Sequence, residues 1–449
     1  MVISEIKYEQ VIERLRFDAE HYQPAFLENE MILKRVNCVP LREVANFSKA
    51  RRNPENIPEE EFEYIDISNI NIFTGEITTQ KLKGYRAPSR ARKVVRENDI
   101  ILSTVRPNRN AVAIIPKKLD NEICSTGFSV IKTRKINPWF LFAFLKTKYA
   151  INQLVRLTMA SMYPAVSEED IGTILIPLPS PSFQENIETV IRKSYKKLNE
   201  ANAKYNEAES LLNKILGIER LDFNQDKIFE VGFDEVEPTL RFDAEHHQLK
   251  YKQIKKVIYK SGYKVKRLKE VVRISTKKID PTQEPAKYFN YIELANINPS
   301  SGEIEEYSQI IGHKAPSRAR MVVKTKDVLV ASLSGSLDNV GLVPHELDGA
   351  IASTGFFVIS SEHFLSEFLF LLFRSDLMKF QLEEKAAGAI MSAVPKTTFG
   401  DLLIPLVPLE KQRLVSNLIK EFFSLRKEAK GLLEKAKKEV EQYIEKGRN

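Results

Sequence analysis

The hexapeptide APSRAR occurs twice in the chain, at residues 87–92 and again at 315–320, 228 residues further on. Solenoid repeats are about 20 to 50 residues long, and this period is far longer. The sequence therefore predicts a duplicated unit, a pseudo-dimer within one chain. Four other stretches recur in the same order, with a separation of 225 residues near the start that rises to 228: RFDAEH at 16–21 and 241–246, YIDISNIN at 64–71 with YIELANIN at 291–298, STGF at 125–128 and 353–356, and IPL at 176–178 and 404–406.

Each repeated unit begins as a region of mixed helix and strand, which we call a lobe. Short apolar runs alternate with Gly, Pro, Asn and Asp, a pattern typical of strands separated by turns. We expect a helix over residues 5–37, an amphipathic helix around 138–157 and a loop that ends near Ser167, before the proline-rich stretch IPLPSPS. The lobe is predicted to be mixed α/β, with strands in the first copy at 63–67, 93–95, 100–103, 111–115 and 128–132.

A long helix with a narrow apolar stripe follows each proline-rich stretch. The stripe residues are spaced alternately four and three apart, which is typical of a coiled coil, and only Arg426 interrupts them. We expect the two helices to form an antiparallel coiled coil, because a helix that packs only on its own lobe needs a wider apolar face. The two stripes are Ile187, Ile191, Ser194, Leu198, Ala201, Tyr205, Ala208, Leu212 and Ile215, and Val415, Ile419, Phe422, Arg426, Ala429, Leu433, Ala436, Val440 and Tyr443.

These patterns divide the chain into four segments. We predict a first lobe at 1–182, a spacer helix at 183–217 that stops at Gly217, a second lobe at 218–409 and a C-terminal spacer helix at 410–449. The predicted fold class is a mixed α/β protein in which two pseudo-symmetric lobes are joined by two long helices.

The composition is that of a globular chain with a moderate basic excess. Among 449 residues, 68 are Lys or Arg and 60 are Asp or Glu, which gives a formal net charge of +8 and weakly favours an anionic partner such as nucleic acid. Cys38 and Cys124 are too few for a disulfide framework and fit buried free thiols. Neither a membrane-spanning run nor a signal-peptide pattern is found, so we expect a cytoplasmic protein.

Several motifs, weak alone, are specific in their order. They are RFDAEHYQP at 16–24, NDIILSTVRPNRNAVAIIP at 98–116 followed by STGF, the second STGF, and IPLVPLEKQ at 404–412 before the last helix. With this duplicated order, essentially the whole chain resembles the specificity subunits of type I restriction-modification enzymes. It departs from them in two places, because the first proline-rich stretch continues as LPSPSFQEN, and because ASLSGSLDNV at 331–340 replaces the STVRPNRNAV of 103–112.

The resemblance implies two target recognition domains, each of which reads one half of a split sequence in double-stranded DNA. It implies that two copies of a DNA methyltransferase subunit dock on the spacer helices, and that a separate restriction and translocase subunit moves and cuts the DNA. It also implies a chain that has no catalytic centre and no cofactor of its own, because S-adenosylmethionine binds to the partner methyltransferase.

Cationic positions shared by the two lobes are candidates for contacts to the DNA backbone. Phosphate is the same at every base step, so both lobes need the same chemistry there. A solvated basic edge, or ion pairs inside each lobe, would give the same pattern. The four matched pairs are Arg86 with Lys314, Arg90 with Arg318, Arg92 with Arg320, and Arg96 with Lys324.

Polar positions that differ between the lobes are candidates for reading bases. Arginine can bridge guanine O6 and N7, asparagine can pair with adenine, and an acid can accept from cytosine N4. The same residues are also ordinary turn formers. A second variable stretch, 160–167 against 388–395, offers Tyr163 or Met391 for base contact or for packing. The main variable loop carries Arg106, Asn108, Arg109 and Asn110 in the first lobe, and Ser334, Ser336 and Asp338 in the second.

Three features that suggest catalysis fit structural roles better. The stretch NPWF at 137–140 imitates an adenine methyltransferase motif but lacks its second proline, and Trp139 opens an apolar helix. His21 and His246 are matched, which indicates a shared structural role. The STGF serines lack a matched base, and a glycine-dependent turn explains them. Without metal-ligand spacing or a nucleotide-binding glycine motif, the sequence predicts a non-catalytic protein with no metal site.

Three other functions stay open at this point. The recognition subunit of a type IIB-like enzyme would have the same lobes and a fused nuclease-methyltransferase partner. An enzyme acting on small molecules or RNA would keep its reactive groups alike in both lobes, yet the most polar loop is where the lobes differ. A coiled-coil scaffold for proteins would not bind DNA tightly even with its partner present.

Overall fold

The computed structural model describes residues 17–158, 164–218, 229–237, 240–386 and 393–447, together with residues 5, 6, 8 and 11. The chain divides into two compact units. From here on, lobe 1 denotes the unit formed by Met1–Leu198 and Arg426–Asn449, and lobe 2 denotes the unit Asn199–Leu425. Each lobe therefore contains part of both long helices, α7 (Pro181–Leu216) and α14 (Leu409–Lys446).

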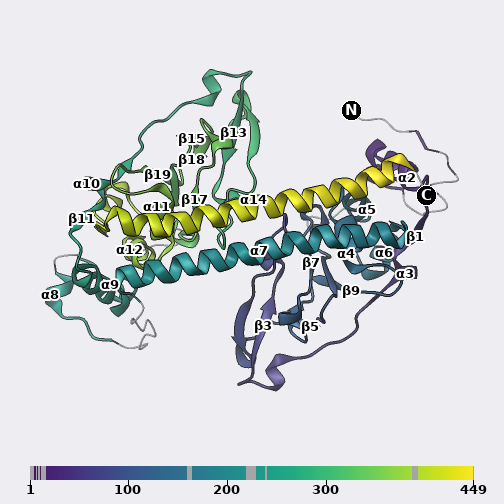
Figure 1. The fold of residues 1–449 in the computed structure, drawn as a ribbon, viewed down its shortest axis with the longest axis horizontal. Coiled ribbons are helices and arrows are strands. Elements are labelled where there is room, and N and C mark those ends of the chain that lie inside the picture. The colour runs from purple at the N-terminus through teal and green to yellow at the C-terminus, as the bar shows by residue number, and fades with distance from the viewer. Residues whose placement is uncertain are drawn as a thin grey trace. The chain divides into compact units, whose positions relative to one another are not determined.

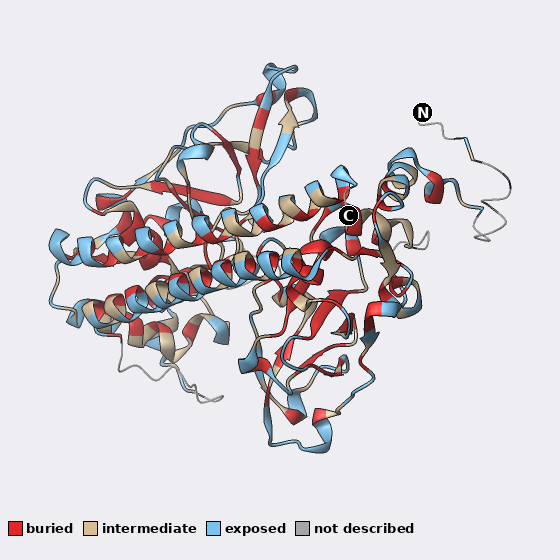
Figure 2. Cartoon of the chain, turned by 45° about the vertical axis from the view of Figure 1, so that its right-hand side comes forward, coloured by how far each residue is buried: buried red, intermediate tan, exposed pale blue. Residues whose placement is uncertain are grey.

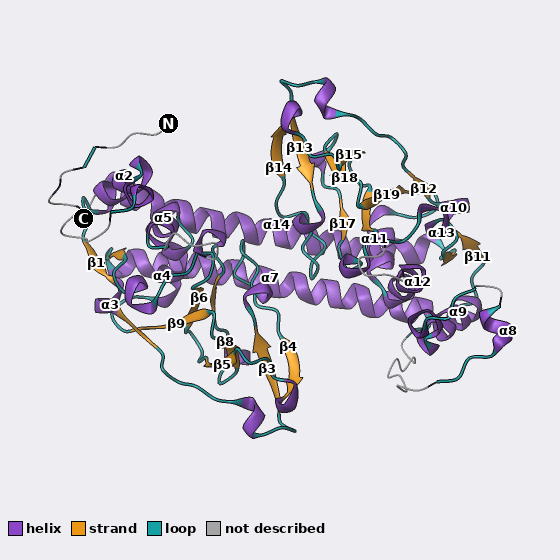
Figure 3. Cartoon of the chain, turned by 180° about the vertical axis from the view of Figure 1, so that it is seen from behind, coloured by secondary structure: helices purple, strands orange, loops and turns teal. Residues whose placement is uncertain are grey.

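Lobe 1 contains two four-stranded sheets, with strand orders β2-β9-β6-β7 and β4-β3-β8-β5, and a two-stranded sheet of β1 and β10 (Figure 3). Neighbouring strands are antiparallel except β3 and β8, which are parallel. The elements are η1 (Ala19–Tyr22), α2 (Pro24–Leu33), β1 (Cys38–Pro40), α3 (Leu41–Val44), β2 (Ala45–Phe47), η2 (Pro54–Asn56), β3 (Glu61–Ile65), η3 (Ile67–Asn69), β4 (Gln80–Lys83), η4 (Gly84–Arg86), β5 (Ala91–Val94), β6 (Ile100–Ser103), η5 (Pro107–Arg109), β7 (Val112–Ile114), η6 (Lys117–Leu119), β8 (Ile123–Ser125), β9 (Phe128–Thr133), α4 (Pro138–Leu145), α5 (Lys148–Arg156), α6 (Glu168–Ile171) and β10 (Leu175–Pro177).

Lobe 2 repeats this topology, with sheets β12-β19-β16-β17, β14-β13-β18-β15 and β11-β20, and with β13 and β18 parallel. Its elements are α8 (Phe233–Val236), η7 (Ala244–His247), α9 (Leu249–Lys260), β11 (Val265–Arg267), α10 (Leu268–Val271), β12 (Arg273–Ile274), η8 (Pro281–Gln283), β13 (Tyr288–Ile292), η9 (Leu294–Asn296), β14 (Ser308–Ile311), η10 (Gly312–Lys314), β15 (Ala319–Val322), β16 (Val328–Ala331), η11 (Ser334–Ser336), β17 (Val340–Leu342), η12 (His345–Leu347), β18 (Ile351–Ser353), β19 (Phe356–Ser360), α11 (Ser366–Arg374), α12 (Asp376–Ala386), α13 (Lys396–Phe399) and β20 (Leu403–Pro405).

Figure 2 shows buried residues concentrated along the strands of the sheets. Strand β6, an inner strand of its sheet, is buried along its whole length, which explains the apolar run of Ile100, Ile101 and Leu102. Successive side chains of a strand point to opposite faces. Ile100 and Leu102 pack with α4 in one core cluster, whereas Ile101 packs with Ile65 of the neighbouring sheet in another. The first sheet thus lies between helices and the second sheet, and the predicted mixed α/β class is confirmed.

The single amphipathic helix predicted around 138–157 is wrong, because two helices occupy this stretch. Helix α4 ends at Leu145, and the Thr147 side chain then accepts a hydrogen bond from the backbone N–H of Ala150 as the cap of α5. Almost every side chain of α4 is buried. A helix surrounded by core needs no polar face, so the amphipathic pattern belongs to α5 alone.

The helix predicted over 5–37 is also too long. Between residues 17 and 37, the structure has a short 3-10 helix, η1, and then α2, which starts at Pro24 and ends at Leu33. Proline fits the first turn of a helix, where its missing N–H costs nothing, but it does not fit the interior.

Helices α7 and α14 pair in antiparallel fashion within each lobe, as predicted (Figure 1). In lobe 1, Ser194 Oγ donates to the carbonyl oxygen of Ala429 at 2.8 Å. In lobe 2, the rings of Tyr205 and Phe422 are 5.2 Å apart. Stripe residues also join the lobe cores, so the helices pack on their own lobes as well as on each other. The first helix ends before Gly217, whose φ of 73° favours glycine.

Arg426, which interrupts the stripe, is only 2% exposed and forms an ion pair in lobe 1. Its Nη2 lies 2.8 Å and its Nη1 3.2 Å from the two carboxylate oxygens of Glu76. The matched position in α7 is Leu198. The charge therefore ties α14 to the loop between η3 and β4 instead of filling the helix seam.

Candidate nucleic-acid interface

The STGF stretch forms the same tight turn in both lobes, between β8 and β9 and between β18 and β19. In lobe 1, Gly127 N donates to Ser125 Oγ at 3.3 Å, and in lobe 2, Gly355 N donates to Ser353 Oγ at 3.2 Å. Neither glycine has a positive φ. Each lies in close packing instead, because a Cβ on Gly127 would lie 2.7 Å from Ile67 Cδ1 and one on Gly355 would lie 2.6 Å from Leu294 Cδ1, so these side chains would have to move.

This turn connects the predicted backbone-contact segment to the predicted base-reading loop. On one side, Thr126 N donates to the carbonyl oxygen of Arg90 at 2.8 Å. On the other side, both N and Oγ1 of Thr104 donate to the carbonyl oxygen of Gly127 at 2.9 Å. Thr104 directly precedes the loop that carries Arg106. The turn therefore fixes the two segments relative to each other.

Lobe 2 repeats these connections. Thr354 N donates to the carbonyl oxygen of Arg318 at 2.9 Å, and N and Oγ of Ser332 donate to the carbonyl oxygen of Gly355 at 2.9 Å. The framework is thus common to both lobes even though the loops it holds differ in sequence.

The candidate backbone-contact cations have three kinds of surroundings. Arg86 and Arg90 are exposed in lobe 1, as are Lys314 and Arg318 in lobe 2. Arg86 also lies over the ring of Tyr85, with its Cζ 5.5 Å from the ring centroid.

Arg92 and Arg320 are half-buried and have partners inside their own lobes. Arg92 donates to the carbonyl oxygen of Ala91 at 2.9 Å and lies 3.5 Å from Glu55. Arg320 donates to the carbonyl oxygen of Ala319 at 3.0 Å and lies 3.5 Å from Asp280. Each guanidinium group also donates to a carbonyl oxygen of the turn that precedes its strand, that of Pro88 or Pro316, at 3.4 Å.

Arg96 and Lys324 are exposed but follow the opposite end of the strand from Arg90 and Arg318. Arg96 Nη1 lies 3.7 Å from Asp120. Six residues of extended chain span about 20 Å, so the structure does not bring this pair together with the others.

The candidate base-reading loop of lobe 1 is a tight turn with two residues in the left-handed region. Arg106 has φ 49° and Asn110 has φ 52°, on either side of η5. Arg106, Asn108 and Arg109 are exposed. Asn110 is half-buried, and its Nδ2 donates to the carbonyl oxygen of Leu145 at 3.1 Å. One of the two N–H donors of its side-chain amide is therefore used within the lobe.

The matching loop of lobe 2 is built differently. Ser334 and Asp338 are exposed and Ser336 is half-buried. Asp338 Oδ1 lies 2.6 Å from Lys379 Nζ, so this acid has a cation beside it. The two loops thus present different donors and acceptors on a common framework. Tyr163 and Met391, in the second variable stretch, lie outside the described residues.

Two cations that the sequence reasoning missed donate hydrogen bonds to the backbone of these loops. Lys146 Nζ donates to the carbonyl oxygens of Ile72 and Asn110, at 2.9 and 3.2 Å. At the matched position, Arg374 Nη1 donates to the carbonyl oxygen of Asp338 in the loop at 3.4 Å, and its Nη2 donates to those of Pro299 and Ser300 at 2.8 Å. Burial, aided by the charge of Lys437, lowers the pKa of Lys146 to about 7. A neutral amine still has two N–H groups, enough for both carbonyls.

Tyr85 is another residue that sequence reasoning missed. It is exposed, and Lys83 Nζ lies 6.0 Å from its ring centroid, on the same short segment as Arg86. Aromatic rings beside cations are typical of surfaces that bind single-stranded nucleic acid. The signal was present in the stretch KLKGYR, at 81–86.

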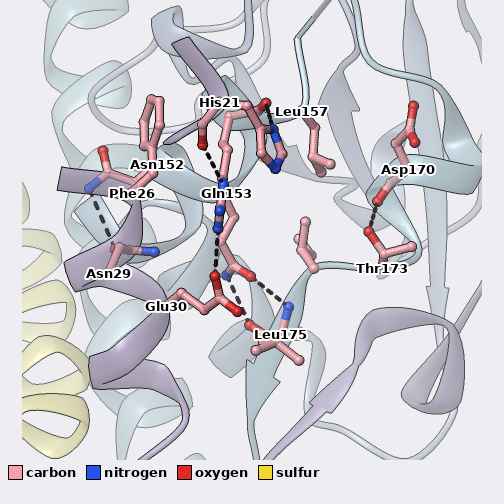
Figure 4. A pocket seen from close by; sticks show the side chains of 12 residues that line it. His21, Phe26, Asn29, Glu30, Asn152, Gln153, Leu157, Asp170, Thr173 and Leu175 are labelled. Atoms are coloured by element: carbon pink, nitrogen blue, oxygen red, sulfur yellow. Dashed lines mark hydrogen bonds and ion pairs between the residues drawn. The ribbon is translucent and has the colours of Figure 1, made fainter. Parts of the chain in front are cut away.

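A pocket of about 440 Å³ lies elsewhere in lobe 1, between η1, α2, α5 and the segment from α6 to β10 (Figure 4). His21, Asn29, Glu30 and Arg156 are among its lining residues, and none of the lining residues belongs to the predicted DNA-contacting set. Arg156 Nη1 lies 2.8 Å from Glu30, so the main charges of the pocket neutralise each other.

The motifs interpreted as structural have structural contacts. Asn137 of NPWF caps α4, because its side chain accepts from the backbone N–H groups of Trp139 and Phe140, and Trp139 is buried. His21 Nδ1 and His246 Nδ1 each lie 3.2 Å from a backbone carbonyl oxygen at matched positions. These predictions are confirmed.

Gln184 and Gln412, at matched positions near the start of α7 and α14, also have structural roles. Each accepts a hydrogen bond from a backbone N–H, of Asn137 or Leu365, at 2.9 Å. In the part of the chain that is described, no group of three or more His, Cys, Asp or Glu side chains could hold a metal ion. No helix among these residues is long and apolar enough to span a bilayer.

Both cysteines are free thiols. Cys124 is buried and Cys38 is half-buried, and burial raises the pKa of each thiol to about 12. A thiol with so high a pKa is not a nucleophile at neutral pH.

Residues 34–210 and 260–441 each match the model of the type I restriction modification DNA specificity domain. The matches cover most of both lobes and both long helices, and they define a chain with two DNA specificity domains. The chain belongs to the type I restriction-modification DNA specificity family.

Similar proteins carry matching names. The type I restriction enzyme MjaVIII specificity subunit of Methanocaldococcus jannaschii is 25% identical over 367 residues, which cover 77% of this chain and 78% of that protein. The HindI specificity subunit of Haemophilus influenzae is 26% identical over 110 residues, 23% of this chain and 24% of that protein. The HsdS subunit of Thermoanaerobacter tengcongensis has a TM-score of 0.33 at 22% identity, with 92% of this chain and 95% of that chain covered.

Proposed function

We propose that this chain, a DNA specificity subunit of a type I restriction-modification system, reads a split DNA target with one half in each lobe. The observation that carries this proposal is the shared framework with unlike loops. The STGF turn binds Arg90 and Thr104 in lobe 1 as it binds Arg318 and Ser332 in lobe 2. The loops it supports differ in their donors and acceptors, as two dissimilar half-sites require.

Within each lobe, we assign two kinds of contact to this surface. Arg86 and Arg90, with Lys314 and Arg318, are exposed and cationic in both lobes, so they suit phosphates. Arg106, Asn108 and Arg109 suit base edges in the first half-site, and Ser334, Ser336 and Asp338 in the second. Arg92 and Arg320 hold the turn on which the phosphate-contacting residues lie.

The chain's proposed role is binding rather than catalysis. S-adenosylmethionine is proposed to bind to partner DNA methyltransferase subunits, which dock on helices α7 and α14. A separate restriction and translocase subunit completes the complex, and the assembly acts in the cytoplasm. Two separated readers on one frame gain affinity through effective concentration, and they lose it when the spacing of the half-sites is wrong.

The test is a map of methylated adenines in a host that lacks adenine methylation. The chain is co-expressed with the methyltransferase subunit of its system, and a matched culture expresses the methyltransferase alone. We expect a new split motif, two short dissimilar halves around a fixed gap, only when the chain is present. Absent methylation, or methylation that does not depend on the chain, contradicts the proposal when both proteins are folded and expressed.

A type IIB-like system is the second candidate, because it would use the same two lobes. DNA cleavage by the purified complex distinguishes the type IIB-like system from the type I system. A complex of the chain and one partner protein that cuts DNA without a third subunit would favour the type IIB-like system. Cleavage that requires a separate translocase subunit supports the type I assignment.

A further inference from the structure

The repeated segment RFDAEH presents an exposed phenylalanine in each lobe. Phe17 is 74% exposed, and its counterpart Phe242 is 78% exposed. A single exposed apolar side chain is ordinary on a protein surface. The same side chain, exposed at the same place in two copies that have diverged elsewhere, indicates a shared use.

The backbone after each phenylalanine is held in place, so the exposure is not that of a loose tail. In lobe 1, Arg156 Nε donates to the carbonyl oxygen of His21 at 2.9 Å, and His21 Nδ1 lies 3.2 Å from the carbonyl oxygen of Arg156. In lobe 2, His246 Nδ1 lies 3.2 Å from the carbonyl oxygen of Glu384. A 3-10 helix begins two residues after each phenylalanine.

The histidine contact beneath this segment is the same in both lobes, but the ion pair next to it has changed, although the phenylalanine has not. The ion pair of Glu30 with Arg156 in lobe 1 corresponds to that of Lys255 with Glu384 in lobe 2, with the charges exchanged. Packing therefore tolerates substitution at this place. The unchanged outward side chain is explained by something outside the lobe.

The exposed carboxylate near each phenylalanine favours a protein over DNA, because in lobe 2 the cation next to Phe242, Arg241, is already paired with Asp243 at 2.6 Å. Glu20 and Glu245, three residues after Phe17 and Phe242, are exposed in both lobes. A carboxylate beside the contact repels phosphate, whereas it complements cationic side chains on a protein. A large aromatic side chain that fills a pocket is a common anchor of protein interfaces.

We propose that Phe17 and Phe242 are equivalent docking points for two copies of the partner methyltransferase subunit. Each phenylalanine enters an apolar pocket bordered by cationic side chains on one copy. This inference rests on the proposed function, which supplies a partner of that kind. It places part of the contact on the repeated RFDAEH segments rather than on the long helices alone.

The test measures how many methyltransferase subunits bind the full chain. Phe17→Ser, Phe242→Ser and the double variant are co-purified with the methyltransferase, and native mass spectrometry gives the stoichiometry at a fixed concentration. We expect each single variant to lose about 30-fold in affinity at one site, and thus to carry one subunit where the wild type carries two. The double variant should carry none.

Matched controls come from exposed apolar residues that are not shared between lobes. Met31 is 56% exposed and Tyr259 is 65% exposed, and their counterparts are Lys256 and Lys34. Met31→Ser and Tyr259→Ser should keep two subunits. Glu20→Lys and Glu245→Lys provide a second test that leaves the phenylalanines intact, and each should weaken one site by about 10-fold.

Three outcomes would overturn the inference. The first is two bound subunits in the double Phe→Ser variant. The second is equal losses in the Met31 and Tyr259 controls. The third is full stoichiometry with weakened binding to target DNA, which would assign the phenylalanines to DNA. The wild-type methylation map is independent of these results, so the inference can fail while the proposed function stands.

Discussion

The two lobes have an ion pair at the same place between two helices, but the positive and negative side chains have exchanged positions. In lobe 1, Glu30 of α2 pairs with Arg156 of α5 at 2.8 Å, and in lobe 2, Lys255 of α9 pairs with Glu384 of α12 at 2.6 Å. Both acids and Arg156 are largely buried, where a lone charge is costly. The comparison teaches that this interface requires a pair, and that either helix can supply the cation.

The variant with the largest expected effect removes this ion pair from lobe 1. Arg156→Glu places two carboxylates side by side, and we expect a loss of about 4 kcal/mol in the unfolding free energy. The measurement is urea unfolding followed by fluorescence, because the chain has a single tryptophan, Trp139, which lies in lobe 1.

The double variant Glu30→Lys with Arg156→Glu reproduces the polarity of lobe 2. It should return to within about 1 kcal/mol of the wild type, because the opposite charges meet again. A double variant as unstable as the single one would show that the surroundings of the pair select its polarity.

The next largest effect concerns Arg426, whose matched residue in the other long helix is Leu198. Arg426→Leu leaves the Glu76 carboxylate without its bidentate partner, and we expect a loss of about 3 kcal/mol, again followed by Trp139 fluorescence. Adding Glu76→Gln removes the uncompensated charge and should restore part of the loss. An unchanged stability in Arg426→Leu would contradict a role for this ion pair.

The difference between the loops proposed to read bases gives the third prediction. Arg106→Ala should weaken recognition of the first half-site by about 1 to 3 kcal/mol and leave the second unchanged, as measured by binding to targets altered in one half. Arg90→Ala is the matched control. Losing a phosphate contact should weaken binding to all sequences alike and reduce the slope of log affinity against log salt concentration by about one. Equal effects of Arg106→Ala on both half-sites would disprove the assignment.

The smallest effect concerns Lys93, which pairs with Glu168 at 2.7 Å where lobe 2 has the buried Met321. Lys93→Met should cost about 1 kcal/mol at pH 7, because Glu168 keeps Lys49 at 3.4 Å and some exposure to water. The same tryptophan fluorescence measures this difference across pH.

The pH dependence of that difference follows from Glu168. Burial raises the pKa of Glu168, but hydrogen bonds and charges from Lys93 and Lys49 outweigh it and hold the pKa below its ordinary value of 4.5. A carboxyl whose pKa is lower in the folded state stabilises the fold at pH values above its unfolded-state pKa. This stabilisation is lost as the pH falls through the folded-state pKa. The cost of Lys93→Met should therefore shrink below about pH 4. A cost that stays constant from pH 7 to pH 3 would show that only packing is involved.

Much of the fold was predictable because the duplication and the helix periodicity are local or repeated signals. The paired helices, the strand at 100–103 and the structural histidines followed from them. The break at Thr147 was not predictable from periodicity, because α4 is apolar on all sides and gives no helical phase. The support from Lys146 was also missed, since its partners are backbone carbonyls distant in sequence. Whether the predicted DNA-contacting residues touch DNA stays a prediction.

The bonds that join the STGF turn to its neighbours have a consequence for how such a protein changes through evolution. Thr126 to Arg90, and Thr104 to Gly127, are linked by main-chain amides and carbonyls. Main-chain bonds of this kind do not depend on which side chains the adjoining loop displays. Substitutions that accumulate at the loop tip are therefore expected to leave this main-chain framework intact, so the displayed side chains can change while the lobe stays folded.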